Sequence, residues 1–367
     1  MGVVIDYTVA YNIYLVFLLL ILLFFSLFKL YGIFVKGRNA EENQKKAKYN
    51  PRVLVIVPCK GLDLTLEQNL KSIKAQDYGN CKMLAVVDSK EDAAVEAINN
   101  AGIDYLISKR TSPAGSGKVH AISTAISKAG NFDVYVIADS DILVKKDWLK
   151  LLIQPLKDLN TGIATTFPRF EPAGGFWSEA KLVWGFVGLG LMESKMTRFG
   201  WGGSIAFRKD IFDYGPYFKT FREALSDDIA LVKIAAQKEL GIAYVPDAAP
   251  VVNSADDFKT FWEWSNRQTA LFLLENRKLF GIGFVFYGLQ LLLFISGIVL
   301  AATVSPLFLV MLLPTVLGII QDLKRAGTVS PSLIVASIIM PFLYFTNILI
   351  GRSMKKILWR GTHYDLA

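Results

Sequence analysis

The chain has 367 residues, of which 53% are hydrophobic and 20% are charged, and its formal net charge is +8 at pH 7. A chain this apolar is not an ordinary soluble enzyme, and because its apolar residues gather near its two ends, the composition predicts an integral membrane protein. The chain has only two histidines, which is almost too few for a histidine-based zinc site or catalytic triad. Its two cysteines are isolated in the sequence, which indicates a reducing compartment.

An N-terminal transmembrane anchor is predicted at residues 1–35, where a long apolar run is broken only by Lys29. No lysine or arginine precedes this run, whereas a basic linker follows it at residues 36–50. Since basic residues stay on the cytoplasmic side, this asymmetry predicts an uncleaved anchor followed by a cytoplasmic domain. The basic residues flank apolar segments without any nucleic-acid-binding motif, so the charge indicates a membrane surface and no nucleic acid.

Residues 51–280 are polar enough to form one globular domain with a sizeable core. Apolar runs at residues 53–57, 83–87, 105–107 and 134–138 predict strands buried on both faces, and segments with helical periodicity lie between them. This alternation predicts an α/β nucleotide-binding domain with a mostly parallel sheet and helices on both faces.

Two aspartates, Asp139 and Asp141, follow the fourth predicted strand directly. Residues spaced i, i+2 share one side of an extended chain, so both carboxylates could converge on a hard cation. Aspartates after a strand are more often part of a turn or a helix cap. On this motif alone both interpretations stay open.

A glycine-rich loop at residues 112–118 ends in Gly117-Lys118, before a predicted helix. It does not meet the P-loop pattern, because the first glycine of that pattern is missing and Val119 follows the lysine. The loop could still hold a diphosphate through backbone amides and the Lys118 ammonium. A flexible surface loop is the alternative.

Three segments further along the domain carry candidate functional residues. Phe176 to Met192 is aromatic and apolar, which predicts a helix that lies against the membrane or lines an acceptor groove, with a buried core helix as the alternative. The glycines of the run at 200–204 allow a ligand to approach the backbone closely. A second acidic pair, Asp227-Asp228, precedes another predicted helix, where the same residues also suit helix capping.

A C-terminal membrane block of two or three helices is predicted at residues 281–351, followed by a basic tail at 352–367. Its middle segment is short and contains Pro314, so it is either a spanning helix or a re-entrant segment, and the number of crossings stays open. The three apolar segments are Ile282–Thr303, Leu307–Ile320 and Leu333–Ile350.

Taken in chain order, these motifs resemble a known family. They are Pro58-x-Lys60-Gly61-x-Asp63, Asp77-Tyr78, Asp88, Gly117-Lys118-Val119, Asp139-Ser140-Asp141, Gly200-Trp201-Gly202-Gly203-Ser204, Ser226-Asp227-Asp228 and a terminal Trp359-Arg360-Gly361. With the membrane segments, their order is similar to that of the ceramide glucosyltransferase group, membrane-bound inverting glycosyltransferases of the family 2 and 21 type. The resemblance covers nearly the whole chain and implies a GT-A-type fold.

The resemblance also implies a donor site and a cofactor. Asp139 and Asp141 would bind Mg²⁺ or Mn²⁺, which neutralises the departing diphosphate. The donor would be a UDP-sugar, with UDP-glucose favoured. The residues implied to bind this nucleotide-sugar are Pro58, Lys60, Asp88, Lys118 and Asp139.

The remaining implied roles belong to catalysis and to the acceptor. Asp228 resembles the general base that takes the acceptor's proton, with Asp227 as a supporting or capping residue. The family's Gln/Arg-x-x-Arg-Trp motif is imperfect here, since Trp264-Ser265-Asn266-Arg267-Gln268 keeps only the arginine, and Arg267 is expected to contact the diphosphate. The missing aromatic would come from Trp262 or Trp264. The expected acceptor-side residues are Trp201, Gly202, Gly203 and Trp264.

These features predict the transfer of a single sugar to a membrane-lipid hydroxyl, as in glycolipid and sphingolipid metabolism, with ceramide or a related lipid as the acceptor. A polyprenyl phosphate acceptor and polysaccharide synthesis are alternatives, although the imperfect motif weakens the latter. From a different class, a non-catalytic membrane scaffold would keep the fold but not the chemistry. A transporter is disfavoured, because the apolar segments contain almost no ionisable residues and no paired repeats.

Overall fold

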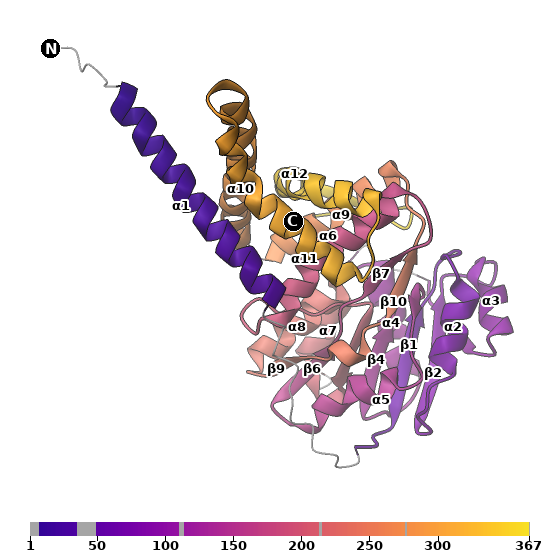
Figure 1. Cartoon of the computed structure of the whole chain (residues 1–367). Coiled ribbons are helices and arrows are strands. Elements are labelled where there is room, and N and C mark those ends of the chain that lie inside the picture. Colours follow the sequence, from indigo (N-terminus) through magenta and orange to yellow (C-terminus); the bar gives the residue numbers. More distant parts are fainter. Residues whose placement is uncertain (1–6, 35–48, 110–113, 213–214, 276, 367) are drawn as a thin grey trace.

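The structure is a computed structural model of the whole chain that describes residues 7–34, 49–109, 114–212, 215–275 and 277–366. Most of the predicted basic linker therefore lies outside the described residues. An α/β domain forms one part of the molecule, and long helices from both ends of the chain project from one side of it (Figure 1).

A seven-stranded sheet in the order β3-β2-β1-β4-β8-β6-β9 forms the centre of the domain. Its first four strands are mutually parallel, and β8 runs antiparallel between β4 and β6. Since β6 and β9 are again parallel to each other, β8 alone opposes the other strands of this sheet. The strands are β1 (Val53–Pro58), β2 (Cys81–Val87), β3 (Asp104–Ile107), β4 (Val134–Ala138), β6 (Thr161–Thr165), β8 (Ser204–Arg208) and β9 (Gly241–Tyr244).

Helices cover both faces of this sheet, because alternate strand residues pack into two separate buried clusters. Val55 of β1 packs into one cluster, and Leu54 and Ile56 pack into the other. Each such fully buried aliphatic side chain stabilises the fold by roughly 1.5–3 kcal/mol. The helices of the first cluster are α2 (Leu66–Lys74), α3 (Ala94–Asn100) and α5 (Trp148–Ile153), and those of the second are α4 (Gly117–Lys128), α7 (Pro216–Arg222) and α8 (Asp227–Gln237).

The predicted α/β, GT-A-type fold class, with a mostly parallel sheet and apolar helices at both ends, is therefore confirmed. A second, three-stranded sheet has the order β5-β10-β7, and helices α6 and α9 of the domain lie next to the apolar helices (Figure 1). The bounds of these elements are β5 (Ile142–Leu143), β7 (Arg169–Pro172), β10 (Val251–Ser254), α6 (Phe176–Glu193) and α9 (Phe258–Glu275), and the short 3₁₀ helices are η1 (Gln154–Lys157), η2 (Lys209–Ile211) and η3 (Pro246–Ala248).

Four helical segments among the described residues are long and apolar enough to cross a membrane. Pro314 lies in the first turn of its helix, where a proline's missing N–H costs nothing, so the middle C-terminal segment continues as helix. The segments are α1 (Tyr7–Phe34), α10 (Arg277–Thr303), η4 with α11 (Pro306–Leu312 and Leu313–Ala326) and α12 (Pro331–Ser353).

Helix α12 lies along the α/β domain, because both of its ends contact that domain. At its start, the hydroxyls of Ser330 and Ser332 donate to Glu179 of α6 at 2.8 and 2.7 Å. Near its end, Gly351 lies so close to α9 that a Cβ there would be 3.0 Å from the backbone nitrogen of Ala270. An apolar helix therefore forms part of the wall of the domain.

The last residues form a β-hairpin of β11 (Lys356–Trp359) and β12 (Thr362–Asp365), where the sequence suggested only a basic tail. Arg360 and Gly361 connect the strands, and both have positive φ, 48° and 75°. Two such residues make the tight turn whose twist matches paired strands. Ile357 is buried, and the guanidinium of Arg360 donates to the carbonyl of Lys60 at 3.2 Å. The hairpin is therefore docked on the domain.

Candidate functional site

One cavity of about 880 Å³ begins at the carboxyl ends of the parallel strands and extends to the apolar helices. Ligands of open α/β sheets bind at this edge of the sheet. The catalytic, donor-side, metal and acceptor-side residues expected from the sequence all line the cavity, although they come from seven segments of the chain, whereas Trp262, the alternative to Trp264, does not line it. The expected residues that line it are Pro58, Lys60, Asp88, Lys118, Asp139, Asp141, Trp201, Gly202, Gly203, Asp227, Asp228, Trp264 and Arg267.

At the polar end of the cavity, the ammonium of Lys60 lies 2.9 Å from a carboxylate oxygen of Asp88. Nearly half of each side chain is exposed, at 46% and 45%. Water screens such an exposed pair, so it is worth at most about 1 kcal/mol and can open readily. Both side chains are therefore available to a ligand in the cavity.

Lys118 connects the two acidic pairs of the site. Its ammonium lies 2.8 Å from Asp139 and 3.2 Å from Asp227, and it donates to the carbonyl of Gly202 at 3.1 Å. Burial by itself lowers the pKa of Lys118, but Asp139 and Asp227 raise it well above its usual value. Lys118 therefore stays protonated. The sequence predicted that its ammonium binds a diphosphate, but in the structure the ammonium contacts groups of the protein itself.

Asp141 carries a buried carboxylate oxygen, Oδ1, without a hydrogen-bond partner. Burial, together with Asp139 and Asp63, raises the pKa of Asp141 to about 7. A buried carboxylate beside other carboxylates favours a cation, which would offset both its desolvation and the mutual repulsion. In the described part of the chain, no three Asp, Glu, His or Cys residues are grouped to hold a metal, so a cation here needs further oxygens from a ligand or water.

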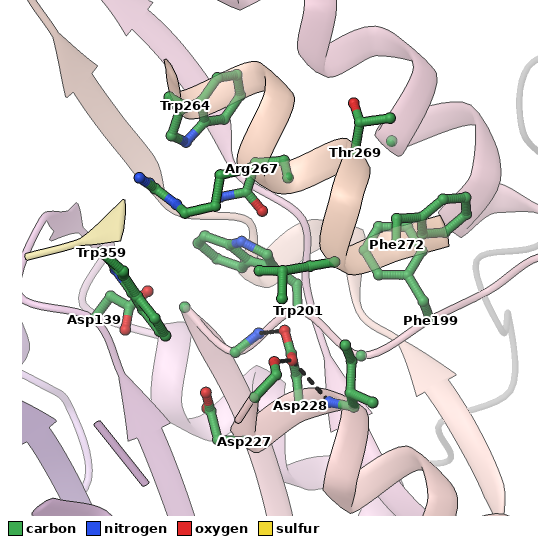
Figure 2. A pocket seen from close by; sticks show the side chains of 18 of the residues that line it. Asp139, Phe199, Trp201, Asp227, Asp228, Trp264, Arg267, Thr269, Phe272 and Trp359 are labelled. Carbon is green, nitrogen blue, oxygen red and sulfur yellow. Dashed lines mark hydrogen bonds between the residues drawn. The ribbon is translucent and has the colours of Figure 1, made fainter. Parts of the chain in front are cut away.

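Asp228 lies in the first turn of α8, and hydrogen bonds fix both of its oxygens (Figure 2). One oxygen accepts from the backbone N–H of Gly202 at 2.9 Å. The other accepts from the N–H of Ile229 at 2.8 Å and from the hydroxyl of Ser226. The carboxylate is thereby held in one orientation at the cavity wall.

Its neighbour Asp227 has a different environment. Only 2% of its side chain is exposed, and one oxygen contacts Lys118 while the other has no hydrogen-bond partner. Burial raises the pKa of Asp227 to about 7, against the opposing effect of Lys118. Asp227 is therefore enclosed by the protein, whereas Asp228 is oriented by it.

Gly202 and Gly203 lie so close to other side chains of the protein that a larger residue would not fit, which the sequence did not reveal. A Cβ at Gly202 would lie 2.7 Å from Oδ2 of Asp227 and 3.1 Å from the Lys118 ammonium. A Cβ at Gly203 would lie 2.2 Å from the Trp201 ring. The sequence predicted that a ligand approaches the backbone of these glycines closely, but in the structure side chains of the protein do so.

Helix α9 places Trp264 and Arg267 on the cavity wall (Figure 2). The Trp264 ring lies edge-on to the Trp184 ring, with 4.7 Å between the ring centres. The ammonium of Lys181 lies 4.7 Å from the centre of the Trp264 ring. The guanidinium of Arg267 donates to the carbonyl of Leu358 in β11 at 3.4 Å. The imperfect motif therefore positions its arginine at the cavity, next to the C-terminal hairpin.

The sequence assigned no site role to two groups of cavity residues. Trp359 and Arg360 of the terminal motif, together with Tyr364, line the polar end from the C-terminal hairpin, and the Arg360-Gly361 turn between two short alternating runs was a signal for that hairpin. The other group belongs to the apolar end and had no sequence signal beyond hydrophobicity. It includes Phe272 of α9, Phe286 and Tyr287 of α10, and Tyr344 and Ile348 of α12, which lie with Val187 of the predicted helix α6 along this end.

Comparison with known proteins gives one family match. The profile described as Glycosyl transferase family 21 matches residues 14–367. No curated protein matches the chain.

Several solved structures are similar to the chain. One is the mannosyltransferase PcManGT from Pyrobaculum calidifontis in complex with GDP-Man and Mn²⁺, at 15% identity over 91% of this chain and 94% of that one, with a TM-score of 0.49. Another is glucosyl-3-phosphoglycerate synthase from Mycobacterium tuberculosis, at 16% identity over 61% of this chain and 79% of that one, with a TM-score of 0.41. Because both TM-scores lie below 0.5, neither similarity assigns a function to this chain.

Proposed function

Because the chain belongs to glycosyl transferase family 21, and is therefore a nucleotide-sugar glycosyltransferase, we propose that it transfers one sugar from a UDP-sugar to a hydroxyl group of a membrane lipid. The continuous cavity is the observation that carries this proposal. Its polar end holds the acidic pairs, and its other end is lined by helices long and apolar enough to cross a membrane. A lipid headgroup could thus reach the polar end while its chains stay in the bilayer, with the α/β domain on the cytoplasmic side.

For the donor, UDP-glucose is the favoured UDP-sugar, held by Lys60 and Asp88 at the ends of β1 and β2. Asp139 and Asp141 would hold Mg²⁺ or Mn²⁺, which would neutralise the diphosphate as it leaves. The unpartnered, buried oxygen of Asp141 supports this assignment, since such an oxygen is costly without a cation or donor.

For the chemical step, Asp228 is the general base. The acceptor oxygen forms a bond to the anomeric carbon as the bond from that carbon to the diphosphate breaks, and the hydroxyl proton passes to the Asp228 carboxylate. Attack opposite the leaving group inverts the configuration, and the products are a glycolipid and UDP. The hydrogen bonds from Gly202, Ile229 and Ser226 support this role, because an oriented base needs no reorganisation during the reaction.

For the acceptor, ceramide or a related lipid with a free hydroxyl fits the apolar end of the cavity. This end combines aliphatic side chains with the aromatic rings of Phe272, Phe286, Tyr287 and Tyr344. Aromatic side chains with one polar atom suit the boundary between lipid and water.

A polyprenyl phosphate is the second candidate acceptor, and Arg267 is the residue that favours it. Burial and the nearby Arg360 lower the pKa of Arg267, and an anion between these guanidiniums would relieve that repulsion. A phosphate on the acceptor or the diphosphate of the donor would serve equally, so the products must decide between them.

The test uses the purified protein in lipid nanodiscs with Mg²⁺ or Mn²⁺ and a panel of UDP-sugars. Ceramide, diacylglycerol and polyprenyl phosphate are offered as acceptors, and both UDP and the glycosylated lipid are quantified. We expect equal amounts of the two products, with ceramide or a related lipid preferred. Preference for polyprenyl phosphate would select the second candidate. Absence of transfer with every pair would contradict the proposed UDP-sugar donor and lipid acceptor.

A variant of the apolar end tests the lipid route directly. Val187→Trp would place a bulky indole ring in the cavity. It should raise the KM for the lipid several-fold and leave the KM for the donor unchanged. Val285→Trp is the matched control, because Val285 is an exposed valine of α10 that does not line the cavity. An unchanged lipid KM in Val187→Trp would contradict the proposed route.

A further inference from the structure

The C-terminal hairpin touches three separate segments at the polar end of the cavity. Arg360 pairs with Asp63 and donates to the Lys60 carbonyl in the loop after β1. The backbone N–H at the start of α4, from Gly117, donates to the hydroxyl of Tyr364 at 3.2 Å. With the bond from Arg267 of α9 already described, the hairpin is held by segments that precede it by up to 300 residues.

Arg360 combines an exposed side chain with a nearly buried partner, whereas Lys60 is as exposed but pairs with an exposed carboxylate, and Lys118 and Lys181 are nearly buried. Lys60 pairs with Asp88, Lys118 with Asp139 and Asp227, and Lys181 with Asp256 at 2.9 Å. Arg360 instead pairs with Asp63, whose side chain is only 10% exposed, and keeps 42% of its own side chain exposed at the cavity. Its guanidinium is therefore anchored on one side and open on the other.

The position of this guanidinium matches the place where a diphosphate would lie. Arg360 lines the cavity together with Lys60, Asp88, Asp139 and Asp141. Burial by itself lowers the pKa of Arg360, but Asp63 raises it, and Asp141 and Asp139 lie close enough to raise it as well. Asp63, which anchors Arg360, also lies close enough to Asp141 to raise the pKa of that carboxyl group. Trp359, the residue before Arg360, also lines the cavity.

We propose that the C-terminal hairpin is a wall of the donor site and that Arg360 binds the diphosphate of the nucleotide-sugar. A guanidinium offers five N–H donors in a planar fork that fits two phosphate oxygens at once. The pair with Asp63 holds that fork in place before the donor arrives, which lowers the cost of ordering it. The inference rests on the proposed function only in requiring a nucleoside diphosphate sugar as donor, whatever its base.

Binding of UDP and of uridine to the full chain in nanodiscs tests the proposal without any turnover. Arg360→Gln should weaken UDP binding about tenfold or more, as expected for the loss of a hydrogen bond to a charged group. Uridine, measured by competition, should bind Arg360→Gln within about twofold of the wild type, because it has no phosphate. Arg360→Lys keeps the charge without the fork and should fall between the wild type and Arg360→Gln.

Lys356→Gln is the matched control, because Lys356 is a basic residue of the same hairpin that is exposed and does not line the cavity. It should leave UDP binding unchanged. Unchanged UDP affinity in Arg360→Gln, or equal losses for UDP and uridine, would overturn the proposal, the second by showing that the hairpin only supports the fold.

GDP and guanosine are measured in parallel, so that a wrong base is separated from a wrong role for Arg360. Binding of GDP but not UDP to the wild type would overturn the proposed UDP donor, and the effect of Arg360→Gln on GDP would then decide the hairpin's role. Binding of neither diphosphate to the wild type would overturn both proposals.

Discussion

The acidic pair after β4 and the acidic pair at the start of α8 face each other across one lysine. Lys118 contacts Asp139 of the first pair and Asp227 of the second. In each pair one aspartate has a buried oxygen without a hydrogen-bond partner, Asp141 in the first and Asp227 in the second. Burial raises the pKa of both of these carboxyl groups to about 7.

The pairs differ in what completes them. For Asp141, burial and the neighbouring carboxylates Asp139 and Asp63 outweigh the opposing effects of Arg360 and Lys181, so its environment suits a cation. Asp227 has the Lys118 ammonium, and its partner Asp228 is held by three hydrogen bonds. Similar sequence motifs therefore support different chemistry, cation binding in one pair and proton transfer in the other, because the surrounding donors and charges differ.

The largest expected effect is that of Asp228→Asn on turnover. An asparagine keeps the shape and most of the hydrogen bonds but cannot take the acceptor's proton, so kcat should fall by about 10³-fold, within the usual range for loss of a general base. UDP binding should stay within about twofold of the wild type. Steady-state kinetics and UDP binding check both expectations. Asp104→Asn, an exposed aspartate of β3, is the control and should be fully active.

The second expected effect is a loss of stability in Lys118→Gln. Removing the ammonium leaves Asp139 and Asp227 facing each other, and loss of one partner of a buried ion pair costs about 3 kcal/mol or more. Denaturant unfolding in detergent measures the change. Lys60→Gln removes a lysine from an exposed pair and should cost less than about 1 kcal/mol. Equal losses in the two variants would show that Lys118 does not hold the pairs together.

Much of the fold followed from local sequence patterns. The buried strands β1, β2 and β4 are short, apolar and rich in β-branched residues, and the apolar helices exceed the length needed to span a membrane. The polar end of the cavity was predictable for the same reason, because parallel strands bring their carboxyl ends to one edge.

The rest of the site depends on contacts between distant segments, which no local pattern encodes. The sequence could not show that Lys118 would reach Gly202, 84 residues further along. Nor could it show that a hairpin only four residues long in each strand would be stable, because its docking relies on Arg360 meeting Lys60 at a separation of 300 residues. The apolar end could not be predicted, because the sequences of α10 and α12 are those of ordinary membrane segments and do not indicate which face of each helix lines a cavity.

The third prediction concerns the cation site and pH. Burial and neighbouring carboxylates raise the pKa of Asp141 to about 7, so the carboxyl group must lose a proton to bind a cation. Below pH 7 the apparent Mn²⁺ affinity should therefore fall, by up to about tenfold for each pH unit. Mn²⁺ titrations followed by electron paramagnetic resonance at pH 5.5 to 8 measure this. In Asp141→Asn the affinity should be weak at every pH, and a wild-type affinity independent of pH would contradict the assignment.

The smallest effect is expected for Asp227→Asn, and it separates the two members of the second pair. The amide keeps the shape of the side chain and an oxygen that Lys118 can contact, and Lys118 still pairs with Asp139. We therefore expect kcat to fall by less than about tenfold, far less than the loss of a general base would lower it. An aspartate with a pKa of about 3.9 in the unfolded chain and about 7 in the fold stabilises the fold fully below pH 4, and this contribution is lost as the pH rises to 7. The stability of Asp227→Asn relative to the wild type should therefore increase from pH 5 to pH 8, as measured by unfolding at both pH values. A turnover defect as large as that of Asp228→Asn would instead make Asp227 the base.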